Sequence, residues 1–131
     1  MEVLTDPKLC RTVTDQYPDY FTFDAEDWFS NPDNYALKEG ENIGFAEPKD
    51  NGVYWVHFCF HTARGKQALD LTKRLLINLF ENKPAKIAIG IISKENKKAL
   101  WVVRVVGFTS LGEVETKNGL CEMFYFIKEN I

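Results

Sequence analysis

The residues best suited to chemistry lie at one junction, where a strand pattern passes through a glycine turn into a helical pattern. The turn, His61-Thr62-Ala63-Arg64-Gly65-Lys66, places a glycine between two cations. The first N–H groups of a helix lack carbonyl partners within the helix, and the positive end of the helix dipole lies there too. Such an end favours a bound anion such as phosphate, although a solvated helix start with scattered bases is the plainer alternative. We therefore predict an anion site at Arg64, Gly65, Lys66, Gln67 and Ala68.

The elements that must position this junction follow from periodicity. Every second residue from Tyr54 to Phe60 is large and apolar, and the residues between them are also compatible with burial, which indicates a central strand. After Gly65, apolar residues recur at spacings of three and four as far as Phe80, which predicts a long helix with one buried face.

Three side chains that could bind a metal or act in catalysis alternate along one face of the predicted strand. They are His57, Cys59 and His61, and they could approach a common point. Imidazole and thiolate both bind zinc, but no fourth ligand or second pair is evident, so no metal site is predicted. A packed or hydrogen-bonded His57 is the simpler interpretation.

The rest of the pattern predicts a mixed α+β fold. Strands are expected at 1–4, 35–39, 42–47 and 53–60, a helix at 6–15, and an antiparallel hairpin at Asn51-Gly52. The strand at 86–92 should lie parallel to the strand at 53–60, because strand, helix and strand in succession make a right-handed crossover. A helix at 96–106 should end at Gly107, and a closing hairpin should pair 108–115 with 120–127.

Residues 16–34 are rich in aromatic and acidic side chains. One helical turn at 24–29, capped by Asp24, is expected within them. The aromatic segment, residues 17–29, could form a lid or a partner surface, or it could simply cover one end of the core.

Length and composition set the class of protein. A chain of 131 residues, 45% hydrophobic, fits a single domain, and the absence of a long apolar run predicts a soluble, cytoplasmic protein without a signal or membrane span. Three cysteines without a CxxC spacing predict free thiols.

Residues 1–60 hold twelve acids and four bases, whereas 61–131 hold seven acids and twelve bases. The basic second half favours a polyphosphate ligand, and the acidic first half argues against binding duplex nucleic acid.

The expected order of elements, a meander followed by helix, strand, helix and hairpin, resembles the GCN5-related N-acetyltransferase fold. Arg64-Gly65-Lys66-Gln67-Ala68 looks like the family's acetyl-CoA pyrophosphate loop. The stretch Asn96-Lys97-Lys98-Ala99, followed by Val106-Gly107-Phe108, is similar to the family's N-x-x-A stretch and its closing G-F pair. Together these motifs cover residues 53–112.

The resemblance implies an N-acyltransferase that uses acetyl-CoA and an unidentified amine acceptor. It implies that the loop at 64–68 holds the pyrophosphate and that the backbone of Phe58 and Phe60 pairs with the pantetheine arm. Asn96 would contact the cofactor, although an asparagine there is also a natural helix cap. His57 or His61 could serve as the catalytic base, with Glu39, Glu41 and Glu47 as unranked alternatives.

Two departures from the family pattern predict weak turnover. The loop holds one glycine where the family usually has two small residues, and Val103 stands where many members carry a proton-donating tyrosine. The sequence also looks similar to acetyltransferase-like proteins of bacteriophages. A virion assembly protein, with little catalysis and with phage structural proteins as partners, is therefore the alternative function.

Overall fold

The computed structural model describes residues 1–5, 25–117 and 119–131. The elements in chain order are β1 (Glu2–Val3), α2 (Ala25–Ser30), β2 (Tyr35–Glu39), β3 (Asn42–Asp50), β4 (Val53–Phe60), α3 (Lys66–Asn82), β5 (Ile87–Ser93), α4 (Lys97–Val106), β6 (Thr109–Thr116), β7 (Gly119–Ile127) and a short 3₁₀ helix (Lys128–Asn130). The predicted helix at 6–15 and most of the aromatic segment lie outside the described residues.

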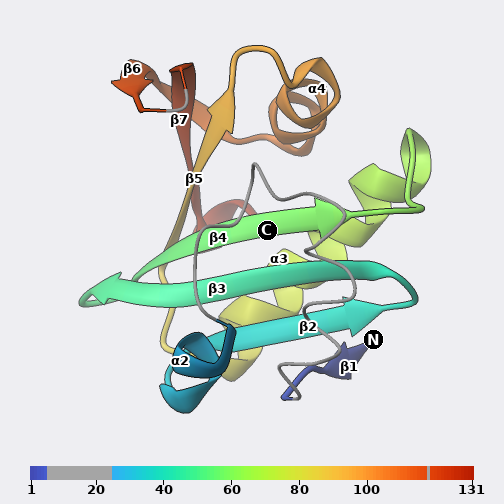
Figure 1. Cartoon of the computed structure of the whole chain (residues 1–131), viewed down its shortest axis with the longest axis vertical. Helices are drawn as coiled ribbons and strands as arrows, with labels where there is room; N and C mark the ends of the chain where they lie inside the picture. The colour runs from blue at the N-terminus through green and yellow to red at the C-terminus, as the bar shows by residue number, and fades with distance from the viewer. Residues whose placement is uncertain (6–24, 118) are drawn as a thin grey trace.

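The strands form one seven-stranded sheet in the order β1-β2-β3-β4-β5-β7-β6 (Figure 1). Among the described strands, β4 and β5 pair in parallel and the other neighbours pair antiparallel. The predicted mixed sheet, its parallel central pair and its closing hairpin are therefore confirmed.

The meander follows the alternation of the sequence closely. The bounds of β2 and β4 are those predicted, and Gly52 turns the chain between β3 and β4 with a φ of +76°. A β-strand at 42–47 was expected, but β3 continues to Asp50. Pro48 pairs with Tyr54, and the register then shifts between Pro48 and Asp50, where Lys49 is the extra residue.

The two faces of the sheet are covered by different helices (Figure 1). Helix α3 buries Ala68, Leu71, Leu75, Leu76, Leu79 and Phe80, as the helical period predicted. On the other face, Trp28 of α2 packs edge-on against Phe45, with ring centroids 5.4 Å apart. The described end of the aromatic segment therefore covers the core.

One glycine lets β3 approach α3 closely. A Cβ atom on Gly44 would lie 2.9 Å from Leu75 Cδ1, which is shorter than real Cβ contacts. The absent side chain therefore sets the distance between strand and helix.

Helix α4 has the two caps that its sequence predicts. Asn96 Oδ1 accepts a hydrogen bond from the Ala99 N–H at 3.2 Å, and Gly107 ends the helix with a φ of +114°. The helix proper begins one residue later than predicted because Asn96 is its cap.

Cys59 and Cys121 are buried free thiols, as predicted, and Cys10 lies outside the described residues. No helix in the described part of the chain is long and apolar enough to cross a bilayer.

Candidate functional site

An opening lies between the two central parallel strands. Strands β4 and β5 pair only at Val53↔Ile87, Tyr54↔Ala88 and Trp55↔Ile89, although both strands continue well beyond. Past Trp55 and Ile89, β4 stays with β3 and β5 stays with β7. The sheet therefore divides at its centre, toward the carboxyl ends of both strands.

The backbone of β4 is oriented into this opening. The Ile87 N–H donates to Gly52 O, and N–H and C=O groups of every second residue along a strand point the same way. The backbone groups of Tyr54, Val56, Phe58 and Phe60 therefore point toward β5. Phe58 and Phe60, predicted as cofactor contacts, lie past the last β4–β5 pair with this orientation.

The turn after β4 is held by Asn42, whose side chain is buried. Asn42 Oδ1 accepts from the Thr62 and Ala63 N–H groups at 3.0 and 3.1 Å, and Nδ2 donates to Thr62 Oγ1 at 2.9 Å. The sequence identified Asn42 only as the start of a strand. Its bonds position the segment leading to Gly65.

Gly65 makes the transition from turn to helix. Its φ of +55° and ψ of −124° suit glycine alone, while a Cβ there would meet nothing within 4 Å. The glycine is therefore required by its backbone conformation rather than by crowding. The space beside it is open.

The five residues predicted to bind an anion divide into two groups. Arg64, Gly65, Lys66 and Gln67 are exposed at the start of α3, whereas Ala68 is buried against the core. Ala68 can therefore offer a ligand only its backbone. The Gln67 N–H donates to Arg64 O at 3.1 Å, so this amide is already engaged.

The charges of this helix start favour an anion. The first turn of α3 holds no acidic residue. Within the described residues, Arg64 donates one hydrogen bond to the neighbouring Ala63 carbonyl at 2.9 Å, so its guanidinium retains further donors. The nearest acid along the helix, Asp70, pairs with Arg74.

Asn96 lies across the opening from this loop. It follows the carboxyl end of β5, as Arg64 and Gly65 follow the carboxyl end of β4, and parallel strands end at the same edge of a sheet. The structure therefore brings the loop and Asn96 to one edge. Capping of α4 occupies the Asn96 side-chain oxygen.

The two predicted histidines are not brought together. His57 lies two residues past the last β4–β5 pair, on the sheet face opposite α3, whereas His61 follows the end of β4 and pairs with Glu41 at 3.6 Å. Four residues of strand separate them by about 13 Å. Cys59, between them, packs into the core, and no group of three metal-binding side chains occurs in the described residues.

Desolvation dominates the electrostatics of His57. Desolvation lowers the pKa of His57, with the neighbouring Glu47 charge raising it and Lys49 lowering it. The lowered pKa favours a neutral imidazole, the form that can accept a proton.

Val103, at the position of the family's tyrosine, is packed inside. It lies 5% exposed on α4 in one cluster with Leu100 and Phe124. No proton can be donated from this side chain.

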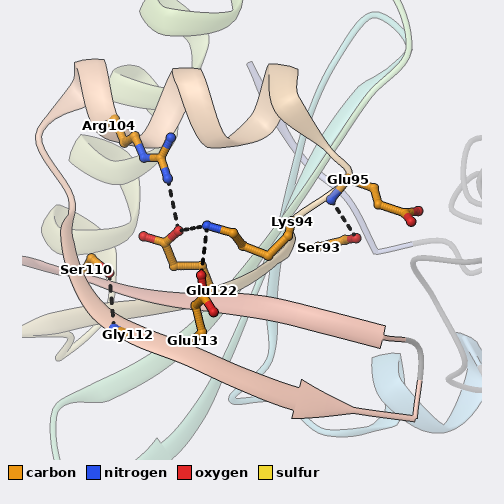
Figure 2. Close-up of polar contacts among 8 residues, drawn as sticks. All are labelled: Ser93, Lys94, Glu95, Arg104, Ser110, Gly112, Glu113 and Glu122. Carbon is orange, nitrogen blue, oxygen red and sulfur yellow. Dashed lines mark hydrogen bonds and ion pairs between the residues drawn. The ribbon is translucent and has the colours of Figure 1, made fainter.

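An ion cluster centred on the buried carboxylate of Glu122 joins β7, α4 and the residue after β5 (Figure 2). Glu122 Oε1 of β7 accepts from Lys94 Nζ at 2.8 Å, just after β5, and from Arg104 Nη2 of α4 at 2.9 Å. Hydrogen bonds from Lys94 and then Ser110 lower the pKa of Glu122 to about 2. This cluster was not predicted from the sequence, because a glutamate within a hairpin is typical of a solvated face.

Neither a family model nor a curated protein matches the sequence. Solved structures do match. The spermidine N-acetyltransferase from Vibrio cholerae, in complex with CoA and spermine, aligns at 12% identity and a TM-score of 0.78 over 98% of this chain and 96% of that chain. The aminoglycoside acetyltransferase AAC(6')-Ib, in complex with coenzyme A and kanamycin, aligns at 14% identity and 0.72 over 98% and 94%.

A third structure, AAC(6')-Ib in complex with ribostamycin and coenzyme A, aligns at 16% identity and a TM-score of 0.59 over 74% of this chain. In that alignment the chain spans 64% of the aminoglycoside enzyme. These likenesses establish the fold, which is that of the GCN5-related N-acetyltransferases, as the sequence resemblance implied.

Proposed function

We propose that this chain binds acetyl-CoA and transfers the acyl group to an amine. The observation that carries the proposal is that the β4–β5 opening and the Gly65 helix start meet at one edge of the sheet. The spermidine and aminoglycoside acetyltransferases that share this fold have structures in complex with CoA. The acceptor is a matter for experiment.

The residues at the loop fit a pyrophosphate. Arg64 and Lys66 offer two exposed cations, Gly65 leaves open space, and the first turn of α3 carries no acid to repel an anion. Gln67 contributes through its exposed side chain, and Ala68 through its backbone.

The two strands that flank the opening, β4 and β5, fit an extended amide-containing chain between them. The backbone groups of Phe58 and Phe60 point toward it in the manner of a strand that accepts another strand. Asn96 follows the carboxyl end of β5, the strand on the other side of the opening.

Acetyl-CoA, when bound, supplies the acyl group as a thioester. His57, two residues past the last β4–β5 pair, would accept the proton that the amine loses as its nitrogen bonds to the acyl carbon and the carbon–sulfur bond breaks. The valine at position 103 could not protonate a departing thiolate. We therefore expect slow transfer, resting chiefly on proximity and orientation. His61, beyond the end of β4, is the second candidate base.

The test is calorimetric titration of CoA into the parent protein and Gly65→Glu. The variant places a carboxylate where the pyrophosphate is expected, and its binding should be lost through steric block and like-charge repulsion. Gly112→Glu is the matched control, because Gly112 also has a positive φ and open surroundings but lies on the edge strand β6. Equal CoA affinity in all three folded proteins would refute the placement.

The alternative, an assembly protein of bacteriophage type, would use the aromatic segment for partner contact. Trp28 of that segment is buried against Phe45, so its ring is unavailable to a partner. No observation among the described residues favours this role. A parent protein that does not bind CoA would favour it over acyl transfer.

A further inference from the structure

The sheet face that carries His57 also carries a carboxylate on the neighbouring strand. Phe45 of β3 lies directly opposite His57, and Glu47 lies opposite Trp55. Glu47 is therefore a diagonal cross-strand neighbour of His57 on the same face, a spacing that long side chains can bridge.

Two groups fix this carboxylate. Trp28 Nε1 of α2 donates to Glu47 Oε2 at 3.3 Å, and Lys49 Nζ lies 3.3 Å from Glu47 Oε1. The Trp28 ring is itself held edge-on against Phe45, the residue opposite His57. Trp28 of α2 therefore contacts both the carboxylate and Phe45, the residue opposite His57.

The charges around His57 act in opposite directions. Partial burial of His57 makes the imidazolium costly, and this desolvation is the largest effect on its pKa. Among the charged side chains of the described residues, Glu47 favours the imidazolium and Lys49 opposes it. Glu47 thus offsets part of the cost of placing a proton on a partly buried imidazole.

We propose that Glu47, held by Trp28, is a positioning residue that makes His57 an effective proton acceptor during acyl transfer. This inference rests on the proposed function for its role in turnover. The link between Glu47 and His57 can be tested without turnover.

The first measurement is an NMR titration of the His57 imidazole. The sequence holds two histidines, so His61→Gln leaves His57 as the sole imidazole signal. In this background, Glu47→Gln should lower the pKa of His57, because burial and Lys49 then act unopposed. Lys49→Gln should raise it. Asp50→Asn, which removes one carboxylate from the same strand, should leave it unchanged.

The second measurement is the pH profile of kcat/KM for acetyl transfer, in variants that retain His61. A base must be unprotonated, so the rate rises with pH through the pKa of His57. The rising limb should move to lower pH in Glu47→Gln and to higher pH in Lys49→Gln, in step with the NMR titration. A variant that merely loosened the fold would change the height of the profile without moving the limb in opposite directions.

The outcomes separate the two proposals. Identical His57 titrations in the parent and Glu47→Gln would overturn the link to Glu47, whatever the activity. Shifted titrations with an unmoved limb would overturn the role of His57 as base. Shifted titrations in a protein without acetyl transfer would uphold the electrostatic link and refute both the proposed function and the part of Glu47 in turnover.

Discussion

The carbonyl oxygen of Val56 lies 3.7 Å from the point that a Cβ on Gly90 would occupy. These two residues stand at the apex of the β4–β5 opening, one residue past the last pair of the two strands. A side chain at Gly90 would therefore lie at the narrow end of the opening.

Gly90→Ala should fold with an unfolding midpoint close to that of the parent, because its nearest contacts, 3.7 and 4.0 Å, are ordinary. Gly90→Leu should reduce CoA affinity by about tenfold or more, or about 1.4 kcal/mol, by filling the apex. Calorimetry beside urea denaturation measures both properties. A folded leucine variant with parental affinity would place the cofactor elsewhere.

Leu75→Ala should destabilise the protein by about 2–5 kcal/mol, because it removes a buried side chain from the face of α3 that packs on the sheet. Urea denaturation measures the loss. An unchanged midpoint would contradict the packing of this helix.

Gly44 and Leu75 should be coupled. Gly44→Ala should cost about 1–3 kcal/mol in the parent, since its Cβ would meet Leu75 Cδ1 at 2.9 Å. In the Leu75→Ala background the same substitution should cost less, by at least about 0.5 kcal/mol. A double-mutant cycle tests this, and additive costs would show that the leucine moves aside freely.

Glu122 should make stability depend on acid pH. Its pKa is lowered in the folded protein to about 2 from an ordinary 4.5, so its contribution is complete above about pH 4.5 and is lost as the pH falls toward 2. Glu122→Gln should reduce stability at pH 7 by about 1–3 kcal/mol and flatten the dependence in that window. Urea denaturation at a series of pH values from 2 to 7 measures the free energy of unfolding of both proteins. Parallel curves for parent and variant would contradict the assigned shift.

Val103→Tyr and Val103→Phe should each destabilise the protein by about 1–3 kcal/mol, because Val103 is packed in the core. Only the tyrosine carries a proton donor. A positioned acid contributes about 10²–10⁴-fold, so the tyrosine variant should release CoA from acetyl-CoA faster than the phenylalanine variant in the presence of amines. Equal release would show that the ring does not reach the opening.

Local patterns predicted the fold because each strand carries its own signal. Alternation and an Asn-Gly turn gave the bounds of β4, and the helical period gave the buried face of α3. The extension of β3 to Asp50 was missed because a proline is typical of a strand end, whereas Pro48 pairs with Tyr54 and the strand continues past a shift in register.

The candidate site could be predicted only where one segment builds it. Gly65 and its flanking cations are contiguous in the sequence, so an anion site could be predicted from them. Asn42 was not, because it acts on amides 20 and 21 residues away. The Glu122 cluster joins partners 18 and 28 residues distant, a distance over which periodicity carries no information.

The sheet order also has a consequence for synthesis on the ribosome. Strand β7 inserts between β5 and β6, and it brings Phe124 and Phe126 into the main core. The nascent chain therefore cannot cover β5 or complete that core before residue 127 has left the exit tunnel. Until then the apolar faces of α3 and α4 stay partly uncovered, so we expect this domain to complete its folding after the residues of β7 emerge rather than progressively along the chain.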